Sequence, residues 1–251
     1  MSHFPQQEWD NMNTILIGID DTDNETSRGT GYLARQVLSE CRQRGLQPVS
    51  VTRHQFFRHE DIPYTSHNSG ACVTIAGEMS VEAVEFVFDY VAERSACGSD
   101  PGVCIAVDTE VTSEIIRFAQ AATREIVTMD QAWRLAQDAG IALRGLGGSN
   151  LGIIGALGSA GLRAEGNEGR FIHLPGLREL NSCVSAETFV NIGIELQYKS
   201  NGRQPLPDDE YHTLGWVRPG LVNHKAVLWV EWSESENAWI PVDRKKSRPL
   251  E

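Results

Sequence analysis

The sequence predicts an α+β fold. Residues 14–107 alternate short apolar runs with amphipathic stretches in the order β-α-β-β-α-β, which is the split βαβ pattern. A glycine-rich helix is expected next. After about residue 185, β-branched and aromatic runs between turn residues indicate a small β-rich C-terminal segment. For roughly the first 108 residues, we therefore expect a mixed or antiparallel sheet with helices on one face.

The elements of the first half are predicted from the spacing of their apolar residues. Strands are expected at residues 14–19, 47–57, 71–77 and 103–107. Helices are expected at residues 31–45 and 80–95. Gly45 is expected to end the first of these helices, and Ser80 to cap the second.

The second half combines helices with shorter strands. Residues 112–139 are expected to form two helices, a further helix to begin near Asn150, and residues 171–175 to form a strand. The C-terminal runs at 189–198, 226–232 and 238–242 are expected to be strands. The tryptophans of this segment are expected mainly as β core, with a dimer surface or a cap over a ligand as alternatives: Trp216, Trp229, Trp232 and Trp239. These patterns divide the chain into residues 14–180 and residues 185–243.

Composition limits the class of protein. The 251 residues carry a net charge of −12, which disfavours general attraction to nucleic acid. No apolar run is long enough to span a bilayer and no signal peptide is visible, so no membrane contact is expected. The five cysteines form no CxxC pair, which argues against a zinc ribbon and indicates reduced thiols in a cytoplasmic protein.

The stretch IGIDDTDNETSRGTGY, residues 17–32, crowds carboxylates at the end of the first strand. Asp20, Asp21 and Asp23 repel one another unless a cation neutralises them, and Mg²⁺ prefers carboxylate oxygens, water and substrate phosphates. The alternative is that these residues only form a turn and cap the next helix.

The residues that follow the acidic loop favour the metal site. Gly29 and Thr30 lie at the N-terminus of the next predicted helix, where free backbone amides and a hydroxyl suit a phosphate. Arg28 is a candidate cation to pair with that phosphate.

The stretch GLGGSNLGIIGALGSAG, residues 145–161, is the second unusual feature. Its first part is a candidate anion-binding loop made of Gly145, Gly147, Gly148, Ser149 and Asn150. The loop resembles the phosphate loop of GHMP small-molecule kinases, and it is not a Walker P-loop because no lysine follows the glycines. The later glycines recur every third residue, so either a nucleotide or a neighbouring backbone packs closely against a structural helix.

The connection between the second and third strands is the most basic stretch. It carries Arg53, His54, Arg58, His59, His67 and Asn68. His54 and His59 are either metal ligands or solvated loop histidines, and the second case is the commoner one. The sequence His67-Asn68-Ser69-Gly70 directly precedes a strand, so we expect it to face the same pocket as the acidic loop.

Three motifs in this order resemble the kinase-like domain of archaeal tRNA agmatinylcytidine synthetase. They are GIDDTD with Tyr32-Leu33-Ala34 downstream, IPY followed by HNSGA, and GIIGALGSAGL. The resemblance covers about residues 14–175. It implies that ATP and Mg²⁺ bind through the acidic and glycine-rich motifs, and that the domain helps to activate a cytidine of tRNA for the attachment of agmatine.

The resemblance also implies roles for single residues. Asp20, Asp21 and Asp23 would handle the metal and the phosphates. Thr30 matches a threonine that the family phosphorylates, while Asn68 and Gly70 match the family's GNGA loop. The chain departs from the family at three positions, since Gly29, Gly31 and His67 stand where the family has cysteine, threonine and arginine. It is also too short to carry both the OB-fold and the zinc ribbon with which the family binds tRNA.

These observations lead to three functional hypotheses. The leading one is an ATP- and Mg²⁺-dependent phosphotransferase, or an ATP-activated ligase-like enzyme, acting on a small molecule, with Arg28 stabilising charge and Asp21 as base. The second is a non-catalytic nucleotide-binding or regulatory module. The third is a tRNA cytidine-modifying enzyme, which the net charge disfavours. The nucleotide hypothesis requires the segments near residues 20, 68 and 148 to share one cavity.

Overall fold

The computed structural model describes residues 13–64, 67–199, 203–215 and 217–242. The strands are β1 (Thr14–Asp20), β2 (Gln47–Gln55), β3 (Ser69–Ala76), β4 (Gly102–Val107), β5 (Ala142–Gly145), β6 (Arg170–His173), β7 (Cys183–Val184), β8 (Ile194–Tyr198), β9 (Tyr211–His212), β10 (Gly220–Val222), β11 (Lys225–Ser233) and β12 (Ala238–Pro241). The helices are α1 (Thr30–Gln43), α2 (Val81–Arg94), α3 (Ser113–Ala121), α4 (Met129–Ala139), α5 (Gly152–Glu165) and α6 (Ala186–Asn191), with a 3-10 turn η2 at Asp108–Glu110.

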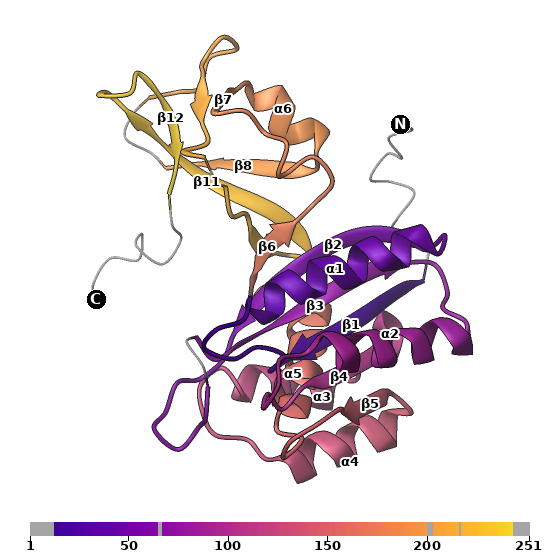
Figure 1. The fold of residues 1–251 in the computed structure, drawn as a ribbon. Coiled ribbons are helices and arrows are strands. Elements are labelled where there is room, and N and C mark those ends of the chain that lie inside the picture. Colours follow the sequence, from indigo (N-terminus) through magenta and orange to yellow (C-terminus); the bar gives the residue numbers. More distant parts are fainter. Residues whose placement is uncertain (1–12, 65–66, 200–202, 216, 243–251) are drawn as a thin grey trace.

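These elements form a mixed sheet in the order β5-β4-β1-β3-β2-β6-β10-β11-β12-β9-β7, with β8 paired to β11 (Figure 1). The α+β prediction is confirmed. The first four strands form an antiparallel sheet in the order β4-β1-β3-β2, which agrees with the antiparallel or mixed sheet expected from the sequence. Within the described ranges, no helix is both long and apolar enough to cross a bilayer.

The two helices of the first 108 residues, α1 and α2, pack on one face of this part of the sheet, as expected, and the later helices α3, α4 and α5 cover the other face. Ile15, Ile17 and Ile19 of β1 contribute to a core with α1 and α2. Leu16 belongs to a second core, which α3, α4 and α5 complete. Alternate residues of a strand face opposite sides of the sheet. Because both sides of β1 are buried, nearly all of its residues are apolar, which explains the continuous apolar run in the sequence.

Glycines on helix α5 and on the strands allow very close packing. A Cβ atom at Gly18 would lie 1.9 Å from the carbonyl oxygen of Ala156. A Cβ atom at Gly102 would lie 2.2 Å from the carbonyl carbon of Gly152. The missing side chains therefore let the backbone of α5 touch the backbones of β1 and β4.

The chain after β6 builds a third core around Trp232, Trp239, Tyr211 and Phe189. Two details differ from the predicted run of strands. Residues 189–191 belong to helix α6, which the side chain of Ser185 caps by accepting from the backbone N–H of Thr188. Strands β8 and β9 pair in parallel with β11 and β12. Residues 200–202, 216 and 243–251 lie outside the described residues, and Trp216 is among them.

Candidate functional site

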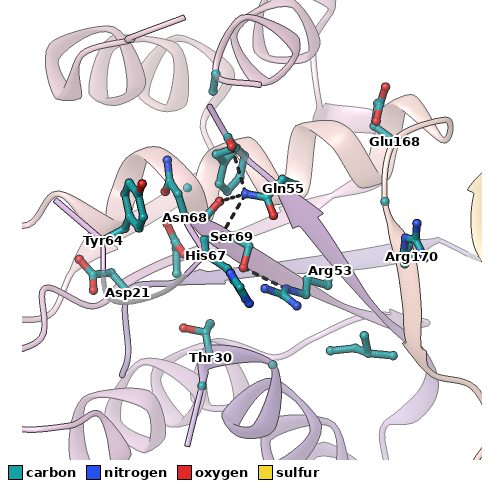
Figure 2. A pocket seen from close by; sticks show the side chains of 18 of the residues that line it. Asp21, Thr30, Arg53, Gln55, Tyr64, His67, Asn68, Ser69, Glu168 and Arg170 are labelled. Carbon is teal, nitrogen blue, oxygen red and sulfur yellow. Dashed lines mark hydrogen bonds between the residues drawn. The ribbon is translucent and has the colours of Figure 1, made fainter. Parts of the chain in front are cut away.

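A cavity of about 700 Å³ opens at the carboxyl end of β1, a volume typical of small-molecule sites. The end of β2, the N-terminal turns of α1 and α5, and the β-rich unit enclose it. Six of the residues predicted for the site line it: Asp20, Asp21, Asp23, Gly29, Thr30 and Asn68. Figure 2 shows Asp21 at one side of the cavity and Arg170 at the other, with Thr30 and Arg53 between them.

The backbone at Asp21 brings the acidic loop together. Its φ of +52° lies in the left-handed region, which a non-glycine residue adopts at a cost of about 1–3 kcal/mol. This turn ends β1, and Asp20, Asp21 and Asp23 then line the same cavity. Backbone strain at this position fits a functional loop.

Asp20 lies against the first turns of α5. A Cβ atom at Gly155 would lie 1.7 Å from its carboxylate oxygen Oδ2, so only glycine leaves room for this carboxylate. Burial, and then the charge of Asp21, raise the pKa of Asp20 to about 8. A carboxyl group in this condition lacks a compensating positive charge, and a divalent cation would supply one.

Asp100 is a further member of the acidic cluster that the sequence analysis missed. The pKa of Asp21 is raised to about 6, first by burial and then by the charges of Asp100 and Asp23. Asp100 precedes β4, which runs antiparallel to β1 with Gly102 opposite Asp20. The split βαβ order could have revealed it, because the residues just before β4 must lie beside the residues just after β1.

Asp23 and Thr30 tie the acidic loop to helix α1. The carboxylate oxygen Oδ1 of Asp23 accepts hydrogen bonds from the Thr30 hydroxyl at 2.9 Å and from the Thr30 backbone N–H at 3.3 Å. The hydroxyl of Thr22 donates to Oγ1 of Thr30 at 3.2 Å. The capping alternative therefore holds for Asp23, while Asp20 and Asp21 do not serve this cap.

The glycine-rich loop before α5 does not line the cavity. The backbone N–H of Ser149 donates to Asp100 Oδ1 at 2.9 Å, and its hydroxyl hydrogen-bonds the other carboxylate oxygen. A Cβ atom at Gly148 would also collide with this carboxylate. The loop thus binds an anion, but the anion is a side chain of the same protein. Gly145, Gly147 and Asn150 lie outside the cavity lining as well.

The cavity reaches the N-terminal turn of α5 at its first glycines instead. Gly152 and Gly155 are lining residues, together with Leu151 and Ile154. Of the three segments expected to converge, those near residues 20 and 68 meet at the cavity. The third contributes residues 151–155 rather than residues 145–150.

Arginine side chains form a positively charged side of the cavity that the sequence analysis largely missed. Its members are Arg35, Arg53, Arg170 and Arg218. Burial, and then the nearby Arg218 and Arg58, lower the pKa of Arg53, because like charges gather around it. Arg53 and Arg170 are direct neighbours across β2 and β6. The chain separates these arginines widely in sequence, so their convergence was not visible there. The arrangement suits a polyanion.

Other predicted residues serve the framework. Arg28 is exposed, with its guanidinium 4.4 Å from the centroid of the Tyr32 ring, and it does not line the cavity. Gly70 lies on β3, where a Cβ atom would be 2.4 Å from the Ser159 hydroxyl of α5. Asn68 lines the cavity, and its amide donates to the Phe57 carbonyl to close the loop.

The two histidines that were candidate metal ligands differ from each other. His54 is fully buried on β2, where Nδ1 lies 2.7 Å from the Glu168 carbonyl and Nε2 lies 2.8 Å from the Thr52 hydroxyl. Both alternatives for His54, a metal ligand or a solvated loop residue, are therefore wrong. His59 lies in the loop, 3.4 Å from Asp61.

Comparison with known proteins agrees with the resemblance. No family model matches the chain. The tRNA 2-agmatinylcytidine synthetase TiaS of Pyrococcus horikoshii is 34% identical over 153 residues, which are 59% of this chain and 35% of that protein. TiaS of Methanosarcina mazei is 28% identical over 175 residues, 64% of this chain and 39% of that one. The chain thus spans little more than a third of the length of these curated relatives.

Solved structures give the same result for the fold. The crystal structure of a tRNA fluorescent labelling enzyme superposes with a TM-score of 0.52 at 26% identity, covering 59% of this chain and 36% of that one. A complex of TiaS with tRNA and ATP has a TM-score of 0.52 at 23% identity with the same coverage. The sequence resemblance is therefore confirmed: the chain is homologous to tRNA agmatinylcytidine synthetases over about three fifths of its length.

Proposed function

We propose that this chain is an ATP-dependent enzyme that modifies a cytidine of tRNA. The observation that carries the proposal is the cavity itself, which holds carboxylates on one side and arginines on the other. Phosphoryl-transfer enzymes need both, because a cation must be held while the charge on the phosphates is neutralised. The homology to tRNA agmatinylcytidine synthetases supports tRNA as the acceptor. This reverses the preference for a small molecule that net charge alone suggests.

The half-buried carboxylates fit a magnesium ion. We assign Asp20, Asp21 and Asp23 to the metal, because burial, and then neighbouring negative charge, raise the pKa values of Asp20 and Asp21, and a cation would relieve both effects. When bound, ATP with Mg²⁺ would supply the phosphoryl group that activates the acceptor. Arg53 and Arg170 would bind the negative charge of the phosphates from the opposite side.

Thr30 is positioned to exchange a proton with the acidic loop. Its hydroxyl donates to Asp23 at 2.9 Å, so this carboxylate can accept the proton if the hydroxyl attacks the γ-phosphorus of ATP and ADP leaves. Gly29 lies beside it in the cavity lining. We therefore assign Thr30 rather than Arg28 to the reacting side of the cavity.

The two parts of the chain have different roles in this proposal. Residues 14–180 form the nucleotide-binding unit. The described residues between 185 and 242 form a β-rich segment that closes one side of the cavity, since Arg218 and Trp229 belong to its lining. The TiaS structures that contain agmatine suggest this amine as the second substrate.

The test is an incorporation assay with purified protein, ATP, Mg²⁺, labelled agmatine and tRNA transcripts. We expect label in tRNA that depends on ATP, and loss of that label in Asp20→Asn and Thr30→Val. Arg117→Gln is the matched control, because Arg117 is an exposed residue of α3 paired with Glu114 at 2.7 Å. Absence of label with every tRNA, while ATP is still hydrolysed, would contradict the tRNA proposal.

A second candidate is a phosphotransferase acting on a small molecule. The enclosed volume of about 700 Å³ favours it, because that volume holds a nucleotide and a metabolite but no folded RNA. ATP turnover that needs a metabolite and is indifferent to tRNA would select this candidate over the first.

A further inference from the structure

A second group of candidate metal ligands lies in the β-rich unit, among residues that the proposed function does not use. Cys183, Glu210 and His212 bring Sγ, a carboxylate oxygen and a ring nitrogen within 4.8 Å of one another. Cys183 and His212 are partly buried, and Glu210 is exposed. This donor set differs from a cluster of carboxylates, because it combines a thiol, an imidazole and a single acid.

Strand register explains why these side chains meet. Cys183 of β7 lies directly opposite His212 of β9 in an antiparallel pair. Residues in that relation share one face of the sheet, with Cβ atoms about 4.5–5.5 Å apart. Glu210 precedes His212 by two positions, so the alternation of an extended chain places it on the same face. The backbone therefore places all three residues on one face, and their side-chain rotamers bring the donor atoms together.

The two ring nitrogens of His212 have different neighbours. Nε2 lies 4.0 Å from Oε2 of Glu210, which is too long for a hydrogen bond and leaves room for an ion between the two atoms. Nδ1 lies 3.4 Å from Oε2 of Glu236. A carboxylate on the far nitrogen of a metal-bound histidine fixes the ring orientation and its tautomer in many zinc sites.

We propose that Cys183, His212 and Glu210 bind a zinc ion, with Glu236 as the outer carboxylate that orients His212. Thiolate, imidazole and carboxylate together suit Zn²⁺ better than Mg²⁺ or Ca²⁺, which prefer oxygen ligands. Three protein ligands leave the fourth tetrahedral position for water or another donor. Binding displaces the thiol proton of Cys183 to solvent.

A bound metal ion would stabilise the two strands at this end of the sheet. Strands β7 and β9 have two residues each and are the last members of the sheet path. Such short strands contribute few ladder hydrogen bonds. A metal bound to residues of both strands would hold them together, and it would also link them through Glu236 to the connection between β11 and β12.

Cobalt(II) titration of the full chain tests the proposal, because Co²⁺ replaces Zn²⁺ and reports its ligands by absorption. We expect one equivalent to give tetrahedral d–d bands and a thiolate-to-cobalt charge-transfer band, both removed by added Zn²⁺. Cys183→Ser should abolish the charge-transfer band, and His212→Gln should weaken binding strongly. Glu236→Gln should lower the affinity about 10- to 100-fold, as loss of an outer carboxylate does.

Cys97→Ser is the matched control, since Cys97 is the exposed cysteine and lies outside the cluster. It should titrate as the wild-type protein does. Zn²⁺ should also raise the melting temperature of the wild-type protein and of Cys97→Ser, but not that of Cys183→Ser. A charge-transfer band that persists in Cys183→Ser, or no thiolate band in the wild-type protein, would overturn the assignment. Ions held only by Asp20 and its neighbours would give no such band.

Discussion

At the scale of single residues, Asp20 is a carboxyl group whose ionised form is destabilised by its position in the fold. The chain places this carboxylate beside Gly155 and next to Asp21, so burial and like charge both favour its protonated form. Raised carboxyl pKa values of this kind are common at functional sites, where a bound ligand supplies the missing positive charge. Asp23 differs, because Thr30 donates two hydrogen bonds to it.

Replacing Asp20 with asparagine should stabilise the metal-free protein at pH 8. The raised pKa means that the folded state binds more protons than the unfolded state between pH 4 and about 8, so wild-type stability falls as pH rises through that window, by at most about 1.4 kcal/mol per pH unit. Asparagine removes this dependence. Urea unfolding of both proteins at pH 5 and pH 8 measures how the unfolding free energy changes with pH. An equal change in the two proteins would contradict the raised pKa of Asp20. The same variant should bind Mn²⁺ at least about tenfold more weakly, a loss of about 1.4 kcal/mol.

His54 should make the protein sensitive to acid. Burial lowers its pKa to about 3, while an unfolded histidine titrates near 6.5. In this case the unfolded state binds the extra proton between pH 6.5 and 3, so stability is complete above pH 6.5 and is lost as pH falls. The loss should be roughly 2 kcal/mol between pH 6.5 and pH 5. Denaturant unfolding of His54→Gln should show a shallower decline over that range than the wild-type protein.

At the scale of elements, helix α5 explains the glycine-rich stretch. Two alternatives were open, a nucleotide or a neighbouring backbone. The structure places backbone of the sheet against Gly152, the side chains of Asp20 and Phe56 against Gly155 and Gly158, and helix α3 against Gly161. Only the first turn, at Gly152 and Gly155, also lines the cavity. The spacing of every third residue therefore reflects close packing of α5 against several neighbouring elements.

Gly155→Ala and Gly147→Ala should separate packing from phosphate binding. Alanine at 155 would force its methyl group into Asp20, so we expect a loss of roughly 1–3 kcal/mol in unfolding free energy and weaker Mn²⁺ binding. Alanine at 147 meets its nearest heavy atom at 3.6 Å, so stability should be unchanged. Denaturant unfolding and metal titration measure both variants. If Gly147→Ala alone impaired ATP binding, the loop before α5 would be the phosphate site after all.

At the scale of the whole molecule, charge is unevenly distributed. The chain carries a net charge of −12, yet arginines from α1, β2, β6 and the segment before β10 gather at one cavity. A local field of this kind can attract a polyanion that the net charge repels. Net charge alone therefore does not decide whether this protein can bind nucleic acid.

Binding of tRNA should depend on salt through these arginines. Arg218 is an exposed lining residue, so Arg218→Gln should weaken binding at low salt and reduce the slope of log affinity against log salt by about one. Arg144→Gln is the control, because Arg144 lies on the edge strand β5 and forms a salt bridge with Glu85 of α2. Fluorescence anisotropy with labelled tRNA at several salt concentrations measures both. Equal slopes for the two variants would exclude Arg218 from the RNA contact.

Local patterns were enough to predict the order of the elements and the acidic loop, because apolar periodicity and a cluster of like charges can be read within a few residues. Three-dimensional packing alone established which faces are covered, that four arginines line the cavity with the acidic loop, and that Cys183 meets His212. These contacts join residues far apart in the chain. They depend on strand order and on register. A one-residue shift in register would move each side chain of a strand to the opposite face of the sheet, and local sequence patterns do not encode which register forms.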